Sequence, residues 1–137
     1  MTLRETAGFL KAKDNFIILT HRRPDGDTVG SAAALCLALR DIGKTAYMSF
    51  NDGITPRLES FAEGLFAPEG YACDTVVAVD IADEKLFCLS DEQYKGKVDL
   101  CIDHHPTNTN YAKNVLLQEH EAATGAVIWQ LDRKSVV

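Results

Sequence analysis

The sequence predicts an α/β protein with a Rossmann-like parallel sheet of about five strands flanked by helices. Two observations support this fold class. Short apolar runs of strand length alternate along the chain with helical stretches, as they do in βαβ units. Three of these runs lead directly into clusters of acidic residues and histidines, and the carboxyl ends of the strands are where open α/β sheets bind ligands.

The first half of the chain is expected to contain a helix, a buried strand, a second helix and a second strand, over residues 2–13, 16–20, 28–42 and 45–50. The run FIILT at 16–20 has the uninterrupted apolar character of a strand that is covered on both faces. The helix 28–42 has Asp27 or Thr28 available as its N-cap and Gly43 as its stop. Its sequence is apolar nearly all round, which predicts burial between layers.

The second half is expected to contain a short helix, three further strands and a closing helix, over residues 57–63, 75–81, 97–103, 114–118 and 122–132. TVVAVDI at 75–81 is the strongest strand pattern of the chain. In residues 97–103, Val98, Leu100 and Ile102 alternate with more polar neighbours, which predicts a strand that is covered on one face only.

The composition is typical of a single globular domain. The chain has 137 residues, of which 46% are hydrophobic and 25% charged, and no apolar run approaches the ~20 residues of a membrane-spanning helix. Its start carries no signal-peptide core, so we expect a cytoplasmic protein that does not bind membranes. The cysteines lie far apart and are expected to be buried thiols rather than disulfides or zinc ligands: Cys36, Cys73, Cys88 and Cys101.

The net charge limits the kind of partner that the protein binds. The chain has 14 basic and 20 acidic side chains, which give a formal charge of −6. A protein that holds long duplex DNA by its phosphates usually carries a basic face, so this mode of binding is not expected. An acidic chain can still bind a small phosphate ligand through metal ions, because bound cations dominate the local field.

Polar clusters follow three of the expected strands at the point where each strand ends. They contain His21, Asp25 and Asp27 after the first strand, Asp80 and Asp83 after the third, and Asp103, His104 and His105 after the fourth. Because the carboxyl ends of parallel strands meet at one edge of the sheet, these side chains are expected to share a site. Carboxylates mixed with imidazoles suit divalent ions, Mn²⁺ best and Mg²⁺ or Zn²⁺ less well. Two ions about 3.5–4 Å apart need a bridging carboxylate, and Asp80 is the candidate.

Each cluster could also be purely structural, with no role in binding or catalysis. The acids of 25–27 and of 80–83 could be solvated loop residues, with Asp27 as a helix cap. An aspartate followed by two histidines is uncommon in a loop, so the run at 103–105 favours a functional site. His120, alone near the start of a helix, is expected to be exposed to solvent.

The polar clusters resemble the first three motifs of the DHH phosphoesterase superfamily. The motifs are His21-x-x-x-Asp25-x-Asp27, the strand end at Asp80, and Asp103-His104-His105, in the family's order and strand context over about residues 15–129. HRRPDGDTVGS at 21–31 is most similar to the nano-RNases (oligoribonucleases) and phosphoadenosine-phosphate phosphatases, and to the cyclic-dinucleotide phosphodiesterases. EHEAATGAVIWQL at 119–131 also resembles a segment of the nano-RNases.

The resemblance implies a role for each residue of the clusters. The ligands of two metal ions would be His21 and Asp25 for the first, Asp27 and His104 for the second, and Asp80 as a bridge. Asp103 would orient a ligand histidine, as a partner of metal-bound imidazole commonly does. His105 would contact the phosphate. The implied reaction is hydrolysis of a phosphoester by a water molecule that two ions activate.

Two features of the family are missing from residues 1–137. A further ligand aspartate is expected well downstream of the DHH motif, and the only late aspartate, Asp132, lies in the closing helix. The smaller C-terminal domain that grips the substrate in relatives is also missing. We therefore expect a DHH catalytic domain that is incomplete at its C-terminus, either a fragment or a natural truncation, with weak or no activity alone. Relatives often dimerise, so a homodimer is also an expectation.

Several functions remain open on the sequence. The leading hypothesis is a metal-dependent phosphoesterase that hydrolyses short oligoribonucleotides or 3′-phosphoadenosine 5′-phosphate. The second is a cyclic-dinucleotide phosphodiesterase or an exopolyphosphatase-type hydrolase with the same chemistry. The third, from another class, is a non-catalytic nucleotide-binding or interaction module, against which the intact ligand set argues. The fourth is a plain doubly wound domain, which predicts no metal affinity.

Overall fold

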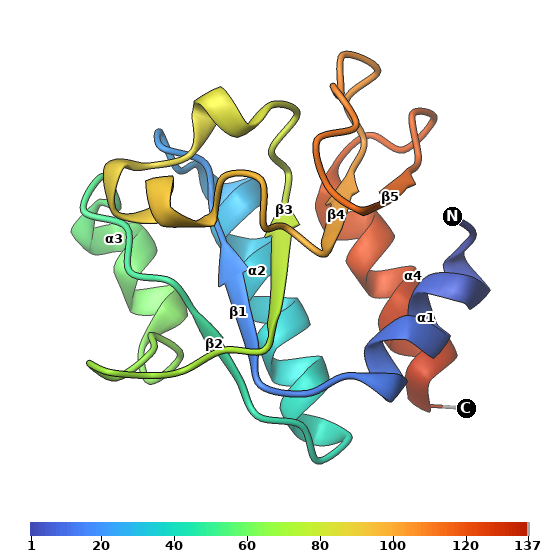
Figure 1. The fold of residues 1–137 in the computed structure, drawn as a ribbon, viewed down its shortest axis with the longest axis horizontal. Helices are drawn as coiled ribbons and strands as arrows, with labels where there is room; N and C mark the ends of the chain where they lie inside the picture. The colour runs from blue at the N-terminus through green and yellow to red at the C-terminus, as the bar shows by residue number, and fades with distance from the viewer. Residues whose placement is uncertain (137) are drawn as a thin grey trace.

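The computed structural model describes residues 1–136 and contains one five-stranded parallel sheet (Figure 1). Across the sheet the strands lie in the order β2 (Ala46–Met48), β1 (Phe16–Leu19), β3 (Thr75–Val79), β4 (Leu100–Asp103) and β5 (Asn114–Leu117). Every neighbouring pair is parallel. The predicted α/β fold with a parallel sheet of five strands is therefore confirmed.

Three helices pack on one face of the sheet, and shorter segments cover the other. The helices are α1 (Leu3–Ala12), α2 (Gly26–Asp41) and α4 (Thr124–Val136). After β2 the chain forms the short α3 (Pro56–Glu59), which continues as the 3-10 turn η1 (Ser60–Ala62). The connection from β3 to β4 contains no α-helix; it consists of the 3-10 turns η2 (Glu84–Leu86) and η3 (Leu89–Tyr94) (Figure 1).

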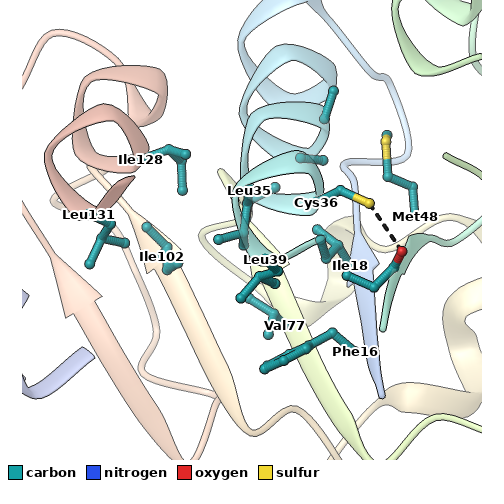
Figure 2. Packing of buried hydrophobic residues seen from close by; sticks show 14 of the residues in the cluster. Phe16, Ile18, Leu35, Cys36, Leu39, Met48, Val77, Ile102, Ile128 and Leu131 are labelled. Carbon is teal, nitrogen blue, oxygen red and sulfur yellow. Dashed lines mark hydrogen bonds between the residues drawn. The ribbon is translucent and has the colours of Figure 1, made fainter. Parts of the chain in front are cut away.

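The core consists of two buried clusters, one on each face of the sheet. Phe16 and Ile18 belong to the cluster beneath the helices, whereas Ile17 and Leu19 belong to the cluster on the other face. This alternation explains why the FIILT run is apolar without interruption. Figure 2 shows the helix-side cluster, in which side chains of the helices pack against those of the strands. The helix residues are Leu35 and Leu39 of α2 and Ile128 and Leu131 of α4.

Two details of α2 differ from the expectation. Its N-cap is Asp25, whose carboxylate accepts a hydrogen bond from the Thr28 N–H at 3.0 Å, so Asp27 and Thr28 are inside the helix. The expected burial between layers is also wrong, because a stripe of the helix faces solvent and leaves the Leu37 side chain 51% exposed. One face of α2 packs against the sheet and the neighbouring helices, and the opposite face is open to solvent.

The expectation that the fourth strand is covered on one face only is also wrong. All four residues of β4 are buried, and Asp103 is 0% exposed. The second face is covered by the segment that follows the strand, where Tyr111 and Asn108 reach back to Cys101 and Asp103. Burial of a carboxylate in this way requires hydrogen-bond partners, which Asp103 finds in its own loop.

The remaining expectations concern the membrane and the cysteines. Within residues 1–136, no helix has both the length and the apolar character needed to cross a bilayer. All four cysteines are free thiols, and Cys36, Cys88 and Cys101 are buried as predicted, while Cys73 is half-buried.

The chain order creates a topological switch point between β1 and β3. From β1 the chain crosses through α2 to β2 on one side, whereas from β3 it continues to β4 on the other side. Ligands of open α/β sheets bind at such a switch point, beyond the carboxyl ends of the strands. The loops that follow β1 and β3 carry His21 and Asp80.

Candidate metal centre

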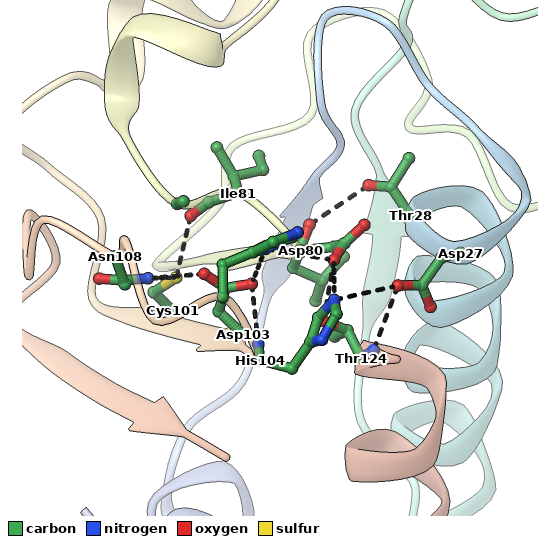
Figure 3. Close-up of polar contacts among 12 residues, drawn as sticks. Asp27, Thr28, Asp80, Ile81, Cys101, Asp103, His104, Asn108 and Thr124 are labelled. Atoms are coloured by element: carbon green, nitrogen blue, oxygen red, sulfur yellow. Dashed lines mark hydrogen bonds and ion pairs between the residues drawn. The ribbon is translucent and has the colours of Figure 1, made fainter. Parts of the chain in front are cut away.

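The three polar clusters converge at the carboxyl edge of the sheet, as Figure 3 shows for those after β1, β3 and β4. Nε2 of His104 lies 3.4 Å from Oδ1 of Asp80 and 3.8 Å from Oδ2 of Asp27. Nδ1 of His105 lies 3.7 Å from Oδ1 of Asp80. Residues that are far apart in the chain therefore meet around one buried carboxylate.

Asp80 is the centre of this arrangement. Its backbone has φ 61°, a left-handed conformation that is uncommon for residues other than glycine, and its N–H donates to the Ile102 carbonyl at 2.9 Å. The side chain is 7% exposed. Burial first, and then the negative charge of Asp27, raise the pKa of Asp80 to about 7. A bound cation would relieve this repulsion.

The ring of His104 is oriented so that one nitrogen faces the carboxylates. Its Nδ1 lies 3.2 Å from the backbone carbonyl oxygen of Glu121. A carbonyl oxygen only accepts hydrogen bonds, so Nδ1 carries the proton and the lone pair of the neutral ring is on Nε2. That lone pair points towards Asp27 and Asp80, which is the tautomer required of a metal-binding imidazole.

Asp27 is held by the first residues of α4. Its Oδ2 accepts from the Thr124 N–H at 3.2 Å and its Oδ1 from the Gly125 N–H at 3.0 Å. The Ser31 hydroxyl, one turn along α2, also donates to Oδ1, at 3.2 Å. The positive end of the α4 dipole stabilises a carboxylate in this position.

Asp103 organises its own loop from beneath. Its Oδ1 accepts from the ring Nδ1 of His105 at 2.7 Å and from the backbone N–H of His104 at 2.9 Å. Its Oδ2 accepts from the Asn108 side-chain amide at 2.9 Å. The carboxylate therefore contacts the ring of His105, and not the ring of the expected ligand His104, which is held by Glu121 instead.

Asp103 dominates the electrostatics of His105. Partial burial lowers the pKa of its ring, but the hydrogen bond and the negative charge of Asp103 outweigh burial and raise it overall. Asp80, His104 and His105 each offer a ligand atom within 4.8 Å of the others. Because Nδ1 of His105 donates to Asp103, the atom nearest to Asp80 has no lone pair for a metal ion.

His21 and Asp25 share with Asp80 a pocket of about 240 Å³ that His105 and Arg23 also line. Nδ1 of His21 accepts from the Arg23 N–H at 3.0 Å. The neutral ring therefore carries its proton on Nε2, and this hydrogen bond must break before either nitrogen can bind a metal ion. Burial, and then the charge of Arg22, lower the pKa of His21, which keeps the ring neutral.

The other predicted residues lie outside the cluster. The Asp83 carboxylate caps η2 by accepting from the Lys85 N–H at 3.0 Å, which is consistent with a structural loop residue. The side chain of His120 is 75% exposed, as predicted. Asp132 lies within α4, beyond its first turns. A larger hollow of about 680 Å³ lies between α1 and α4 and contains no residue of the polar clusters.

Sequence reasoning missed the residues that support the cluster from behind. They are Ser31, Asn108, Glu121, Thr124 and Gly125. The available signal was the likeness of residues 119–131 to a nano-RNase segment, to which the sequence alone assigned no ligand. Glu121, Thr124 and Gly125 contribute backbone groups, and Thr124 also contributes its hydroxyl, from the turn that leads into α4. Such contacts leave no pattern of charged residues in the sequence.

Comparisons with known proteins agree with the fold and the motifs. The family model described as DHH family, N-terminal domain, matches residues 15–136. The bifunctional oligoribonuclease and PAP phosphatase NrnA of Thermus thermophilus is 32% identical over 135 residues, which cover 94% of this chain and 40% of that protein. This chain therefore spans about two fifths of the length of that relative. The crystal structure of an exopolyphosphatase-related protein from Bacteroides fragilis superposes with a TM-score of 0.69 at 18% identity, over 97% of this chain and 43% of the other.

Proposed function

Since this chain belongs to the DHH family, we propose that it is the N-terminal catalytic part of a two-metal phosphoesterase that acts on short oligoribonucleotides or 3′-phosphoadenosine 5′-phosphate. In this proposal His21 and Asp25 would hold one divalent ion, Asp27 and His104 would hold the other, and Asp80 would be the ligand shared as a bridge. Mn²⁺ is the proposed metal, with Mg²⁺ or Zn²⁺ as alternatives.

The observation that supports the proposal is that Asp80 lies near both sets of donor groups. His21 and Asp25 line one pocket with it, and Nε2 of His104 lies 3.4 Å from Asp80 and 3.8 Å from Asp27. Buried like charges are unfavourable without a compensating cation, and the raised pKa of Asp80 expresses that cost. Carboxylate oxygens with an imidazole lone pair are a donor set that fits a divalent transition-metal ion.

The chain's own residues would divide the work of phosphoester hydrolysis. Divalent ions, when bound, neutralise charge on the phosphate and lower the pKa of water. Asp103 fixes the ring of His105 through Nδ1, which leaves Nε2 directed away from Asp103 and able to meet a phosphate oxygen. Because its pKa is raised, His105 binds a proton more readily than an ordinary histidine and can donate it to that oxygen. Arg23 lines the same pocket, and its positive charge would attract the phosphate.

The relative and the net charge both support the proposed substrate class. The Thermus protein is named for oligoribonuclease and PAP phosphatase activities. A net charge of −6 disfavours contact with a long phosphate backbone and suits a small ligand. The free, mostly buried thiols fit a reducing compartment, and we propose a cytoplasmic enzyme.

We further propose that a remaining ligand of the second ion and a substrate-binding domain are encoded beyond residue 137. The Thermus relative is more than twice as long as the matched segment, which leaves room for both. Residues 1–137 alone would then hydrolyse substrate weakly or not at all.

Hydrolysis assays on the longer gene product test the proposal. We expect Mn²⁺-dependent release of mononucleotides from di- to pentaribonucleotides, or of phosphate from 3′-phosphoadenosine 5′-phosphate, and loss of both in Asp80→Asn. Faster cleavage of a cyclic dinucleotide or of polyphosphate would assign the alternative substrate within the same chemistry. Nucleotide binding without any hydrolysis would support a binding module and contradict an enzyme.

A further inference from the structure

We propose that residues 121–125, the turn that leads into α4, position the ligands of the second metal ion, with the Thr124 hydroxyl as the central contact. The inference rests on the proposed function, because it takes Asp27, Asp80 and His104 as the ligands of that ion. It assigns a role to a segment that carries no metal ligand of its own.

One short segment contacts all three ligands. The Thr124 hydroxyl donates to Oδ1 of Asp80 at 3.0 Å, and the Thr124 N–H donates to Oδ2 of Asp27 at 3.2 Å (Figure 3). The Glu121 carbonyl meets Nδ1 of His104 at 3.2 Å. These partners come from three elements, so the segment holds together groups that follow β1, β3 and β4.

Thr124 is the residue that touches both carboxylates. It is 0% exposed, so its contacts are shielded from competition by water. A hydroxyl and an N–H together fix the orientation of two like-charged groups without adding a charge that would compete with a cation. Thr124 is therefore a positioning residue: it acts through Asp27 and Asp80 and would not itself bind the ion.

The ligands proposed for the first ion are held differently. His21 takes its hydrogen bond from the Arg23 N–H, and Asp25 takes its own from the Thr28 N–H, both within the loop and helix that follow β1. No hydrogen bond among the described residues links the 121–125 segment to His21 or Asp25.

The Thr124 hydroxyl holds Oδ1 of Asp80, the same oxygen that Nε2 of His104 faces at 3.4 Å. A change at Thr124 should therefore weaken the second site directly, and the first site less, because it reaches that site only through the shared Asp80.

Mn²⁺ titration of the 137-residue chain, followed by the electron paramagnetic resonance of free Mn²⁺, tests this difference. Thr124→Val removes the hydroxyl at nearly constant shape, and Thr124→Ser restores it. His104→Ala identifies which binding step belongs to the second ion. Thr75→Val is the matched control, because Thr75 is also buried and its hydroxyl donates to the Asp14 carbonyl at 3.2 Å, at the opposite end of β3.

We expect Thr124→Val to weaken the step that His104→Ala abolishes by about tenfold or more, and the other step by less than about threefold, as changes behind a metal ligand do. Thr124→Ser and Thr75→Val should bind both ions as the parent chain does. Equal weakening of both steps by Thr124→Val, or of neither, would overturn the inference.

Two further outcomes separate the inference from the proposed function. If Mn²⁺ binds only in a step that His104→Ala leaves unchanged, no ion uses the second site; the inference falls and a metal-binding chain remains. If the parent chain binds no Mn²⁺ at all, the metal site of the proposed function falls together with the inference.

Discussion

Nε2 of His104 lies 3.4 Å from Oδ1 of Asp80, so a ring nitrogen of the imidazole and a buried carboxylate face the same point. The Glu121 carbonyl on Nδ1 fixes that ring, and the Thr124 hydroxyl fixes the carboxylate. Both donor groups are set in place before any ion arrives. Without a cation, the unfavourable burial of negative charge in this arrangement falls mainly on Asp80.

The metal-free protein should lose stability through Asp80 as pH rises. Its pKa is about 7 in the folded chain, against an ordinary value of 3.8. The stabilising contribution of the protonated form is complete below about pH 4 and is lost as pH rises through about 7. Each unit of difference between the folded and unfolded pKa values corresponds to about 1.4 kcal/mol. In thermal unfolding with EDTA, Asp80→Asn should therefore gain stability relative to the parent between about pH 5 and about pH 8. A constant difference between the two proteins over that range would contradict the assigned burial of charge.

Asn108 should be essential to the buried Asp103 because its amide is a donor to Oδ2 at 2.9 Å. Asn108→Asp replaces the donor with a second carboxylate, and we expect a loss of about 1–3 kcal/mol in unfolding free energy at about pH 8. The loss should shrink at about pH 5, where the pair can share a proton. Urea denaturation at both pH values measures it.

The matched control for that change is Asn15→Asp. The Asn15 amide also donates to an aspartate, Asp74, but this pair is exposed to solvent. Water and salt screen the new repulsion there, so the effect should be well below that of Asn108→Asp. Similar losses at both positions would show that burial of Asp103 does not determine the cost.

Gly53 should be needed for the shape of the loop that carries His21. A Cβ at this position would lie 2.8 Å from the Arg22 carbonyl oxygen and 3.2 Å from Oδ1 of Asn51. Asn51 in turn donates to the His21 carbonyl at 2.7 Å. Gly53→Ala should cost about 1–3 kcal/mol and weaken Mn²⁺ binding, because backbone must move to relieve the clash.

Gly8→Ala is the control for the glycine substitution. No atom lies within 4 Å of the added Cβ, and Gly8 is in the interior of α1. This variant should gain about 0.5–1 kcal/mol from the lower chain entropy of alanine and leave Mn²⁺ binding unchanged. Destabilisation by both substitutions to the same extent would show that the clash at Gly53 does not determine the cost.

The fold could be predicted from the sequence because its elements have local patterns. FIILT and TVVAV are buried on both faces and read as strands, and the turns that follow them hold the polar residues. The edge of the sheet at which Asp80 meets His104 follows from parallel strand order alone. The chain's membership of the DHH family agrees with those motifs.

What the sequence did not predict depends on contacts between distant residues. The Thr124 hydroxyl meets Asp80 across 44 positions, and the Gly125 N–H meets Asp27 across 98. A hydroxyl or a backbone amide at a helix start has many local uses, so neither is recognisable as part of a site. Neither Asp27 nor Thr28, the two caps that the sequence suggests, is the N-cap of α2. Asp25 and Asp27 are both suitable cap residues, and Asp27 instead accepts a hydrogen bond from the first residue of α4.

The most direct test of a two-metal phosphoesterase site is calorimetric titration of Mn²⁺ into the chain and its Asp80→Ala and His104→Ala variants. His120→Ala and Asp41→Ala serve as controls, because both residues are exposed and lie outside the polar clusters. We expect one or two bound ions in the parent and in the controls, with binding weakened or lost in the Asp80 and His104 variants. Equal Mn²⁺ affinity in all five proteins, or none in the parent, would contradict it.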